Sequence, residues 1–242
     1  MTHPNLLLVS SSGYRDAGFL VNSLPAVKAF MPDDLEELLF IPFANVAREY
    51  DAYEAKMAAA LEGLNFNVKS IHHADDPVAA VQSAKAIAVG GGNTFALLLR
   101  LQEAGLVDPI RQAVQGGAHY VGWSAGSNLA CPTMRTTNDM PICQPLSFET
   151  LDLVPFQINA HFVSGKLANH NGESREDRLV EFLSLNPDES VLALPEGVAF
   201  LSQGEQTTLC GEADGFLFTR GARQTLKRGE DLSWLLTRDR KQ

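Results

Sequence analysis

Short apolar runs alternate with longer amphipathic stretches through the first half of the chain. Most of these runs lack the polar residue at every second position that marks a half-exposed strand, and such continuous runs are typical of parallel strands covered by helices on both faces. The runs that predict strands are NLLLVS (5–10), ELLFIPF (37–43), NFNVKSI (65–71), AIAVG (86–90) and YVGW (120–123). The stretches that predict helices lie around 17–30, 49–63, 76–84 and 94–115, the last broken near Gly105. This order predicts an α/β fold with a doubly wound, mostly parallel sheet.

The second half follows a looser pattern. Four prolines between residues 131 and 160 indicate loops and short strands. A helix is expected over 174–185, and SVLALPEG (190–197) predicts a buried strand that ends in a turn. From 198 to 226, short runs separated by glycines predict a C-terminal antiparallel meander. Because no linker or repeat interrupts the chain, we expect one domain over residues 1–242.

Composition excludes several classes of partner. The net charge is −10, and no basic patch is present, which argues against binding to nucleic acid or to an anionic membrane. No stretch approaches the roughly 20 apolar residues of a membrane helix. The N-terminus lacks the basic segment of a signal peptide. The three cysteines, Cys131, Cys143 and Cys210, show no CxxC spacing, so neither a disulfide framework nor a zinc site is indicated and a cytoplasmic location is expected.

Ser124 is the central residue of a G-x-S-x-G pentapeptide, GWSAG. A serine becomes a nucleophile when its hydroxyl is exposed on a turn and a base takes its proton. Glycines on a sharp strand-to-helix turn remove the Cβ atoms that would otherwise collide there. The alternative is a serine that only caps the following helix. The pentapeptide alone leaves both interpretations open.

A second glycine cluster, VGGGNTF (89–95), follows another predicted buried strand. Consecutive glycines can turn backbone N–H groups toward a ligand. We expect Gly91 or Gly92, together with Ala125, to form an oxyanion hole. The alternatives are a phosphate-binding loop or a plain turn, although the lysine of a P-loop is absent and GGGN does not fit GxGxxG.

The base must come from six histidines, any of which can be purely structural: His3, His72, His73, His119, His161 and His170. His72 and His73 open a segment expected at the surface. His119 lies too close to Ser124 in sequence to fold back on it. His161 follows the extended FQINA and is expected at the end of a strand, where it would reach the ligand crevice. His161 is therefore the best candidate.

The carboxylate that orients the base has two candidates. Asp139 lies in TTNDMP, a loop after the expected nucleophile helix. Glu196 lies in LPEG, directly after a predicted buried strand. Both segments are also good turn sequences, and spacing does not choose between them.

Six segments together, in this order and spacing, resemble the peptidase E branch of the S51 serine-peptidase family: GGGNTF, GWSAGSNLACP, RTTNDMPI, INAHF, GESRE and LPEG. The resemblance runs from the first strand to about residue 200. It implies a flavodoxin-like sheet similar to class I glutamine amidotransferases and a cytoplasmic serine dipeptidase that cleaves Asp-Xaa dipeptides without a metal or other cofactor.

By motif, the resemblance implies Ser124 as nucleophile and His161 as base, with Asp139 and Glu196 competing for the third role. It also implies that Arg175 binds the aspartyl side chain, because a guanidinium holds a carboxylate with two hydrogen bonds. The alternative is a helix-surface arginine paired with Glu176 or Glu181. One departure is Ala160, where the peptidase E pattern has proline.

Two other functions remain in view. One is an isoaspartyl or cyanophycinase-type peptidase of the same family, which comparison of α- and β-aspartyl dipeptides would distinguish. The other is a non-catalytic amidotransferase-like binding module. The expected partner is a small peptide, and the sequence does not decide between monomer and homodimer.

Overall fold

The structure, a computed structural model, describes residues 3–166 and 171–237. Seven strands form a large sheet in the order β3-β2-β4-β5-β1-β8-β9. The first five in this order are parallel, whereas β8 and β9 run antiparallel to their neighbours. These strands are β1 (Leu6–Val9), β2 (Glu37–Ile41), β3 (Asn67–Ser70), β4 (Ala86–Val89), β5 (His119–Trp123), β8 (Val198–Gln203) and β9 (Gln206–Gly211).

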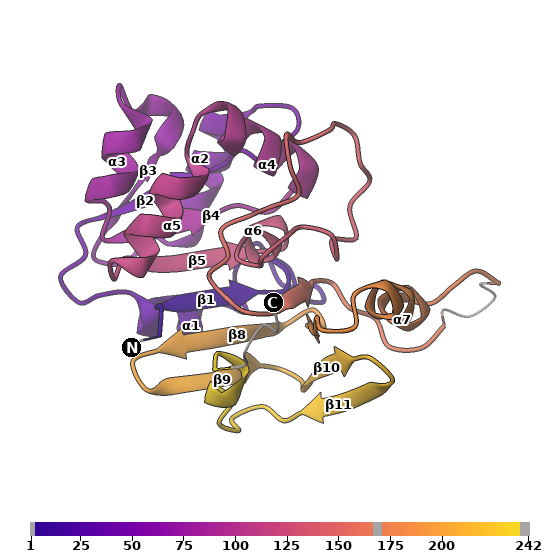
Figure 1. The fold of residues 1–242 in the computed structure, drawn as a ribbon. Helices are drawn as coiled ribbons and strands as arrows, with labels where there is room; N and C mark the ends of the chain where they lie inside the picture. The colour runs from indigo at the N-terminus through magenta and orange to yellow at the C-terminus, as the bar shows by residue number, and fades with distance from the viewer. Residues whose placement is uncertain (1–2, 167–170, 238–242) are drawn as a thin grey trace.

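Helices cover both faces of the large sheet (Figure 1). Alternate residues of β1 enter two different cores, Leu6 and Leu8 one core, Leu7 and Val9 the other. The first core includes α3 (Pro77–Ser83), α4 (Thr94–Glu103), α5 (Val107–Gln115) and α6 (Ala125–Leu129); the second includes α1 (Leu24–Phe30) and α2 (Tyr50–Ala60). Burial on both sides explains why the runs of central strands such as β1 and β4 are apolar throughout. The predicted α/β fold with a mostly parallel sheet is confirmed.

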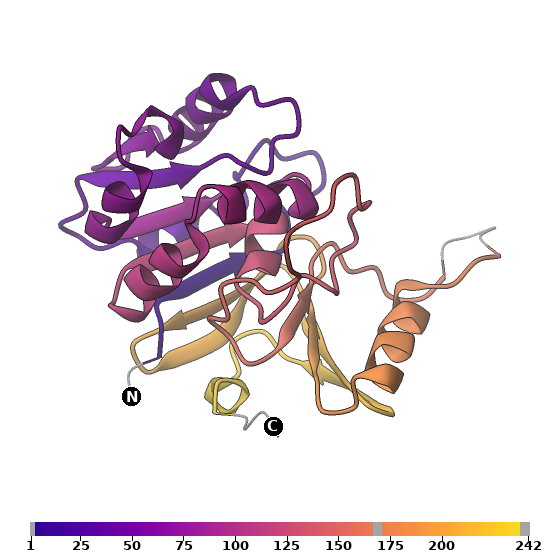
Figure 2. The ribbon, with the colours of Figure 1, turned by 45° about the horizontal axis from the view of Figure 1, so that its top comes forward.

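A smaller sheet lies beside the large one in the order β11-β10-β7-β6 (Figure 2). Its strands are β6 (Gln157–Asn159), β7 (Val191–Ala193), β10 (Gly215–Thr219) and β11 (Ala222–Leu226). Helix α7 (Arg175–Leu185) packs on this sheet through Leu179 and Leu183, which share a core with Phe162 and Phe218. Two short 3-10 helices complete the described elements, η1 (Ile71–His73) and η2 (Ser233–Leu235).

The predicted C-terminal meander is present, but it is divided between the two sheets. Strands β8 and β9 extend the large sheet from β1, whereas β10 and β11 extend the small sheet from β7. Gly211 ends β9 with φ +113°, and a Cβ there would lie 2.0 Å from the Gly197 carbonyl oxygen. A glycine is therefore needed where the chain leaves one sheet for the other.

Proline and glycine set the boundaries of two of the expected helices. The first begins only at Leu24, because Pro25 supplies a preorganised first turn and residues 19–23 form a turn instead. The expected break near Gly105 is real, since Gly105 has φ +65° and separates α4 from α5. In the described part of the chain, no helix has the length and apolarity needed to cross a membrane.

The carboxyl ends of three adjacent parallel strands meet at one edge of the large sheet. Strand β5 lies between β4 and β1, and all three run in the same direction. Ser10 follows β1, Gly90 follows β4 and Ser124 follows β5. Such an edge is where ligands bind in open α/β sheets.

Candidate active site

Ser124 occupies a strained turn between β5 and α6. Its φ and ψ are 54° and −113°, a combination that non-glycine residues rarely adopt. Its backbone N–H donates to the Val9 carbonyl oxygen at 3.0 Å, which ties the turn to the neighbouring strand. Its side chain makes no capping hydrogen bond to the helix. The simple helix-cap interpretation therefore lacks its defining contact, and the backbone geometry is that of a nucleophile elbow.

The flanking glycines are required by packing. A Cβ on Gly122 would lie 2.4 Å from the Gly126 carbonyl oxygen, and a Cβ on Gly126 would lie 2.2 Å from that of Val89. Each distance is far below van der Waals contact. The turn can therefore be this tight only because both positions lack side chains.

His161 brings its ring to the Ser124 hydroxyl. It follows β6 and also has positive φ, 54°. His161 Nε2 lies 2.9 Å from Ser124 Oγ, and His161 Nδ1 lies 2.7 Å from Glu196 Oε1. Both ring nitrogens are thus engaged, one by a hydroxyl and one by a carboxylate. This is the arrangement in which imidazole accepts a hydroxyl proton.

Glu196 lies in the turn between β7 and β8, as predicted for the end of a buried strand. Its side chain is 49% exposed and that of His161 is 37% exposed, so the pair lies at the rim of the site. The next residue, Gly197, has φ +78°, and a Cβ there would lie 2.8 Å from the Tyr14 ring. This glycine lets the chain turn directly after the carboxylate.

Asp139 lies in the same cleft but has different partners. Its Oδ2 accepts hydrogen bonds from the Thr94 backbone N–H at 2.7 Å and the Thr94 hydroxyl at 2.5 Å. Thr94 is the first residue of α4, where a negative charge is stabilised by the helix dipole. Both ring nitrogens of His161 are taken by other groups. Of the two candidate acids, the structure therefore brings Glu196 to the imidazole and leaves Asp139 facing the cleft.

The glycine loop after β4 lies against Ser124. A Cβ on Gly91 would be 3.1 Å from Ser124 Cβ, and one on Gly92, whose φ is +141°, would be 2.3 Å from the Ala44 carbonyl oxygen. In the part of the chain that the structure describes, no hydrogen bond uses the backbone N–H of Gly91, Gly92 or Ala125. These three donors are therefore available to an oxyanion.

Tyr53, on α2, braces this loop. Its hydroxyl donates to the Gly91 carbonyl oxygen at 3.1 Å and accepts from Trp123 Nε1 at 3.1 Å. Burial raises the pKa of Tyr53 to about 12, although its hydrogen bonds with Trp123 and Gly91 act in the opposite direction. The phenol therefore remains a neutral donor that links the glycine loop to the residue before Ser124.

Arg175 is the first residue of α7 and lines a smaller pocket of about 280 Å³, whose lining includes neither Ser124 nor His161. Its Nη1 donates to Asn138 Oδ1, and Asn138 Nδ2 donates to the Ala160 carbonyl oxygen at 2.6 Å. Partial burial lowers the pKa of the guanidinium, Arg178 adds to this effect and Asp139 opposes it. Glu176, one of the partners considered from the sequence, instead pairs with Arg223 at 2.8 Å.

The remaining histidines lie elsewhere. His119 begins β5, so the strand places it roughly 17 Å from Ser124 at about 3.3 Å per residue. His72 and His73 lie on η1, and His3 precedes β1. His170 is outside the described residues.

Three residues of the site were not anticipated from the sequence. Ser10 Oγ accepts from the His161 backbone N–H at 2.9 Å and donates to the Leu194 carbonyl oxygen at 2.7 Å. Tyr53 and Lys56 both line the cleft from α2. The position of Ser10 after a parallel strand was a usable signal. The sequence carried no such signal for Tyr53 and Lys56, because the packing of α2 decides which of its faces lines the cleft.

The cleft around Ser124 has a volume of about 680 Å³. This size is typical of small-molecule sites, which span roughly 300–1,000 Å³. Its walls include Ser124, His161, Asp139, Gly92 and Lys56. The cleft therefore combines a hydroxyl, an imidazole, a carboxylate, backbone donors and a cation within the dimensions of a short peptide.

The chain is similar to known peptidases over most of its length. The family model described as peptidase family S51 matches residues 6–210. Peptidase E of Pasteurella multocida (strain Pm70) is 48% identical over 214 residues, which cover 88% of this chain and 92% of the relative. Peptidase E of Nostoc sp. (strain PCC 7120) is 42% identical over 212 residues, 88% of each chain.

Among solved structures, a peptidase from an acI-B1 Actinobacterium is similar with a TM-score of 0.68. The match covers 96% of this chain and 97% of that protein at 22% sequence identity. At this identity the likeness concerns the fold. It extends over both sheets rather than only the parallel core.

Proposed function

The chain belongs to peptidase family S51, and within that family we propose that it is a serine dipeptidase acting on dipeptides with an N-terminal aspartate. The observation that carries the proposal is the continuous series from Ser124 Oγ through the His161 ring to Glu196, at 2.9 and 2.7 Å. A module that only binds a ligand has no need for a strained serine joined to an imidazole and a carboxylate.

In the proposed reaction, His161 Nε2 takes the proton of Ser124 as Oγ attacks the carbonyl carbon of the first residue. The backbone N–H groups of Ala125 and Gly92 receive the oxyanion, and loss of one such donor costs about 3 kcal/mol of transition-state stabilisation. His161 then protonates the leaving amine. Water, deprotonated by His161, hydrolyses the ester and releases aspartate.

Glu196 orients the base in this proposal. Its carboxylate accepts the Nδ1 proton of His161, which leaves Nε2 free to act on Ser124 and stabilises the imidazolium that forms. The 2.7 Å separation supports this role. Asp139, whose Oδ2 is held by Thr94, instead binds the free amine of the peptide from inside the cleft. A carboxylate placed there favours substrates with an unblocked N-terminus.

Two cations are available for the carboxylates of the substrate. Arg175 is the proposed partner of the aspartyl side chain, since its guanidinium donates to Asn138, the residue before Asp139 in the sequence, and carries the positive charge that a carboxylate needs. Lys56 lines the Ser124 cleft itself, with Nζ 4.4 Å from the centre of the Phe19 ring. We assign Lys56 to the C-terminal carboxylate of the dipeptide. Local cations are needed because a net charge of −10 repels an acidic peptide.

Ser124→Ala provides the direct test. The variant should lose at least 10⁴-fold in kcat for Asp-Leu while keeping the wild-type circular dichroism spectrum. Ser184→Ala, on the exposed face of α7, is the matched control and should retain full activity. Near-normal turnover by Ser124→Ala would contradict the mechanism.

Two comparisons separate the alternatives. A serine-directed phosphonate should label wild-type protein at Ser124, and a non-catalytic binding module would not react. Asp-Leu and its β-aspartyl isomer should then be compared. Faster cleavage of the β-linked peptide would indicate an isoaspartyl or cyanophycinase-type enzyme.

A further inference from the structure

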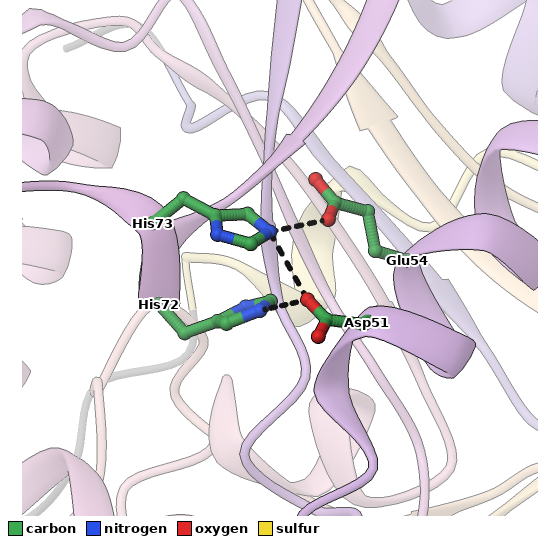
Figure 3. Close-up of side chains that lie close together, drawn as sticks. All are labelled: Asp51, Glu54, His72 and His73. Atoms are coloured by element: carbon green, nitrogen blue, oxygen red, sulfur yellow. Dashed lines mark hydrogen bonds and ion pairs between the residues drawn. The ribbon is translucent and has the colours of Figure 1, made fainter.

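Two histidines and two carboxylates converge outside the Ser124 cleft (Figure 3). Asp51 and Glu54 lie three residues apart on α2, which places them on one face of the helix. His72 and His73 lie on η1, directly after β3. One ligand atom from each of the four residues lies within 4.8 Å of all the others.

Three of the six ligand-to-ligand distances in this cluster are close to those of a four-coordinate metal site. His72 Nε2 and His73 Nε2 lie 2.9 and 3.3 Å from Asp51 Oδ1, and His73 Nε2 lies 2.9 Å from Glu54 Oε2. Bonds of about 2.1 Å to a tetrahedral zinc ion separate its ligands by roughly 3.4 Å. Small outward movements of exposed side chains would therefore make room for the ion.

Ser70 orients two of the four side chains from outside the cluster. Its hydroxyl lies 2.6 Å from His72 Nδ1, and its backbone N–H donates to Glu54 Oε1 at 2.6 Å. The other nitrogen of His72 and the other oxygen of Glu54 are left to face the cluster. Metal-binding histidines commonly have their second nitrogen held in this way.

We propose that Asp51, Glu54, His72 and His73 bind one Zn²⁺ ion. Two imidazoles with two carboxylates form a donor set that suits Zn²⁺, whereas Mg²⁺ prefers oxygen ligands alone. The side chains of His72 and Glu54 are each 19% exposed, and Ser70 fixes the orientation of both. Asp51 at 85% and His73 at 49% leave it open to ions from solution.

The ion would join α2 to the segment after β3. Helix α2 also carries Tyr53, whose hydroxyl bonds the glycine loop beside Ser124. Zinc would therefore stabilise the wall of the cleft without touching a reacting group. The proposal does not depend on the peptidase mechanism.

Calorimetric titration of the full-length, chelator-treated protein tests the site. One equivalent of ZnCl₂ should bind, at least 100-fold more tightly than MgCl₂. Both His73→Ala and the double variant Asp51→Asn/Glu54→Gln should weaken zinc binding at least 10-fold. His3→Ala and Asp75→Asn are controls outside the cluster and should leave it unchanged.

His161, which pairs with Glu196 beside Ser124, offers an alternative binding point for the ion. His161→Ala should bind zinc as wild type does, so binding lost in His161→Ala but retained in His73→Ala would overturn the proposal. Co²⁺ gives a second readout. An intense visible absorption band, expected for four-coordinate Co²⁺, should appear in wild type and vanish in His73→Ala. A weak, octahedral spectrum in wild type would also overturn the four-ligand site.

Discussion

The hydroxyl of Ser10 receives the backbone N–H of His161 at 2.9 Å across 151 residues of sequence. The same hydroxyl donates to the Leu194 carbonyl oxygen at 2.7 Å, two residues before Glu196. Ser10 therefore joins the end of β1 to the segments that carry both the base and its carboxylate. His161 holds a positive φ that needs such external support.

Ser10→Ala should lower kcat for Asp-Leu by roughly 5- to 10-fold, because the backbone of His161 loses a hydrogen bond of about 1 kcal/mol that fixes its ring. Ser202→Ala is a matched control, since Ser202 also bonds a distant carbonyl oxygen, that of Pro4. Steady-state kinetics and thermal unfolding should be measured together. Equal kcat losses in the two variants would argue against a positioning role for Ser10.

Glu196→Gln and Asp139→Asn should affect different kinetic constants. The first should lower kcat by about 10²- to 10⁴-fold, because an amide no longer stabilises the correct tautomer and the imidazolium. The second should chiefly raise KM, because it weakens binding of the free amine. Glu205→Gln, in an exposed turn, serves as the control. A larger kcat effect for Asp139→Asn would reverse the assignment of the acid.

Gly126→Ala should destabilise the fold as well as the site. The added Cβ would lie 2.2 Å from the Val89 carbonyl oxygen, a backbone atom that cannot rotate away. We expect a loss of about 2–3 kcal/mol in the free energy of unfolding, measured in urea. Gly13→Ala should be nearly neutral, because nothing lies within 4 Å of a Cβ at that position.

Stability should fall between pH 10 and pH 12 through Tyr53. Burial raises the pKa of its phenol to about 12 in the folded protein, whereas an unfolded tyrosine ionises near pH 10. Below pH 10 both states hold the proton, so the stabilising contribution is fully present. Above pH 10 the tyrosine of the unfolded state ionises first, which lowers the free energy of unfolding by about 2–3 kcal/mol at pH 12.

Tyr53→Phe should lessen that loss, although buried Tyr120, whose pKa also lies well above 10, keeps part of it. Urea unfolding at pH 9 and pH 12 measures the difference. Equal losses in wild type and Tyr53→Phe would contradict the assignment.

Arg175→Met should raise KM for Asp-Leu by roughly 10- to 100-fold, because a charge-assisted hydrogen bond contributes about 1.5–3 kcal/mol. The effect should be small for Ala-Leu, which lacks the side-chain carboxylate. Arg178→Met, in the same pocket, is the matched control.

Lys56→Met tests the other carboxylate of the substrate. It should weaken binding of Asp-Leu but not of Asp-Leu amide, whose C-terminus is uncharged. Equal effects on both peptides would show that Lys56 does not bind the C-terminal carboxylate.

Much of the fold follows from local pattern. The apolar runs of β1, β4 and β5 predict a parallel sheet because residues such as Leu6, Leu7 and Leu8 are buried on alternate faces. The division of the tail between two sheets was not predictable from these patterns. It depends on which edge strand, β1 or β7, each hairpin meets, and that choice is made by tertiary packing.

The site was predictable to a similar extent. Ser124 and His161 directly follow strands, and the carboxyl ends of strands are where open α/β sheets bind ligands. Spacing did not choose between Asp139 and Glu196, because both are turn residues and only the folded chain shows which one reaches His161 Nδ1. Tyr53 and Lys56 were not predicted, because the sequence of a helix does not show which of its faces will line a cleft.

The three residues of the proposed series are divided between the two sheets. Ser124 ends a strand of the large sheet, His161 follows a strand of the small sheet, and Glu196 lies in the turn that connects them. A chain still emerging from the ribosome, with only its first five strands formed, would therefore hold the serine without its base. On the proposed mechanism, hydrolytic capacity would therefore arise only after the segment from β6 to β8 has packed beside the parallel strands.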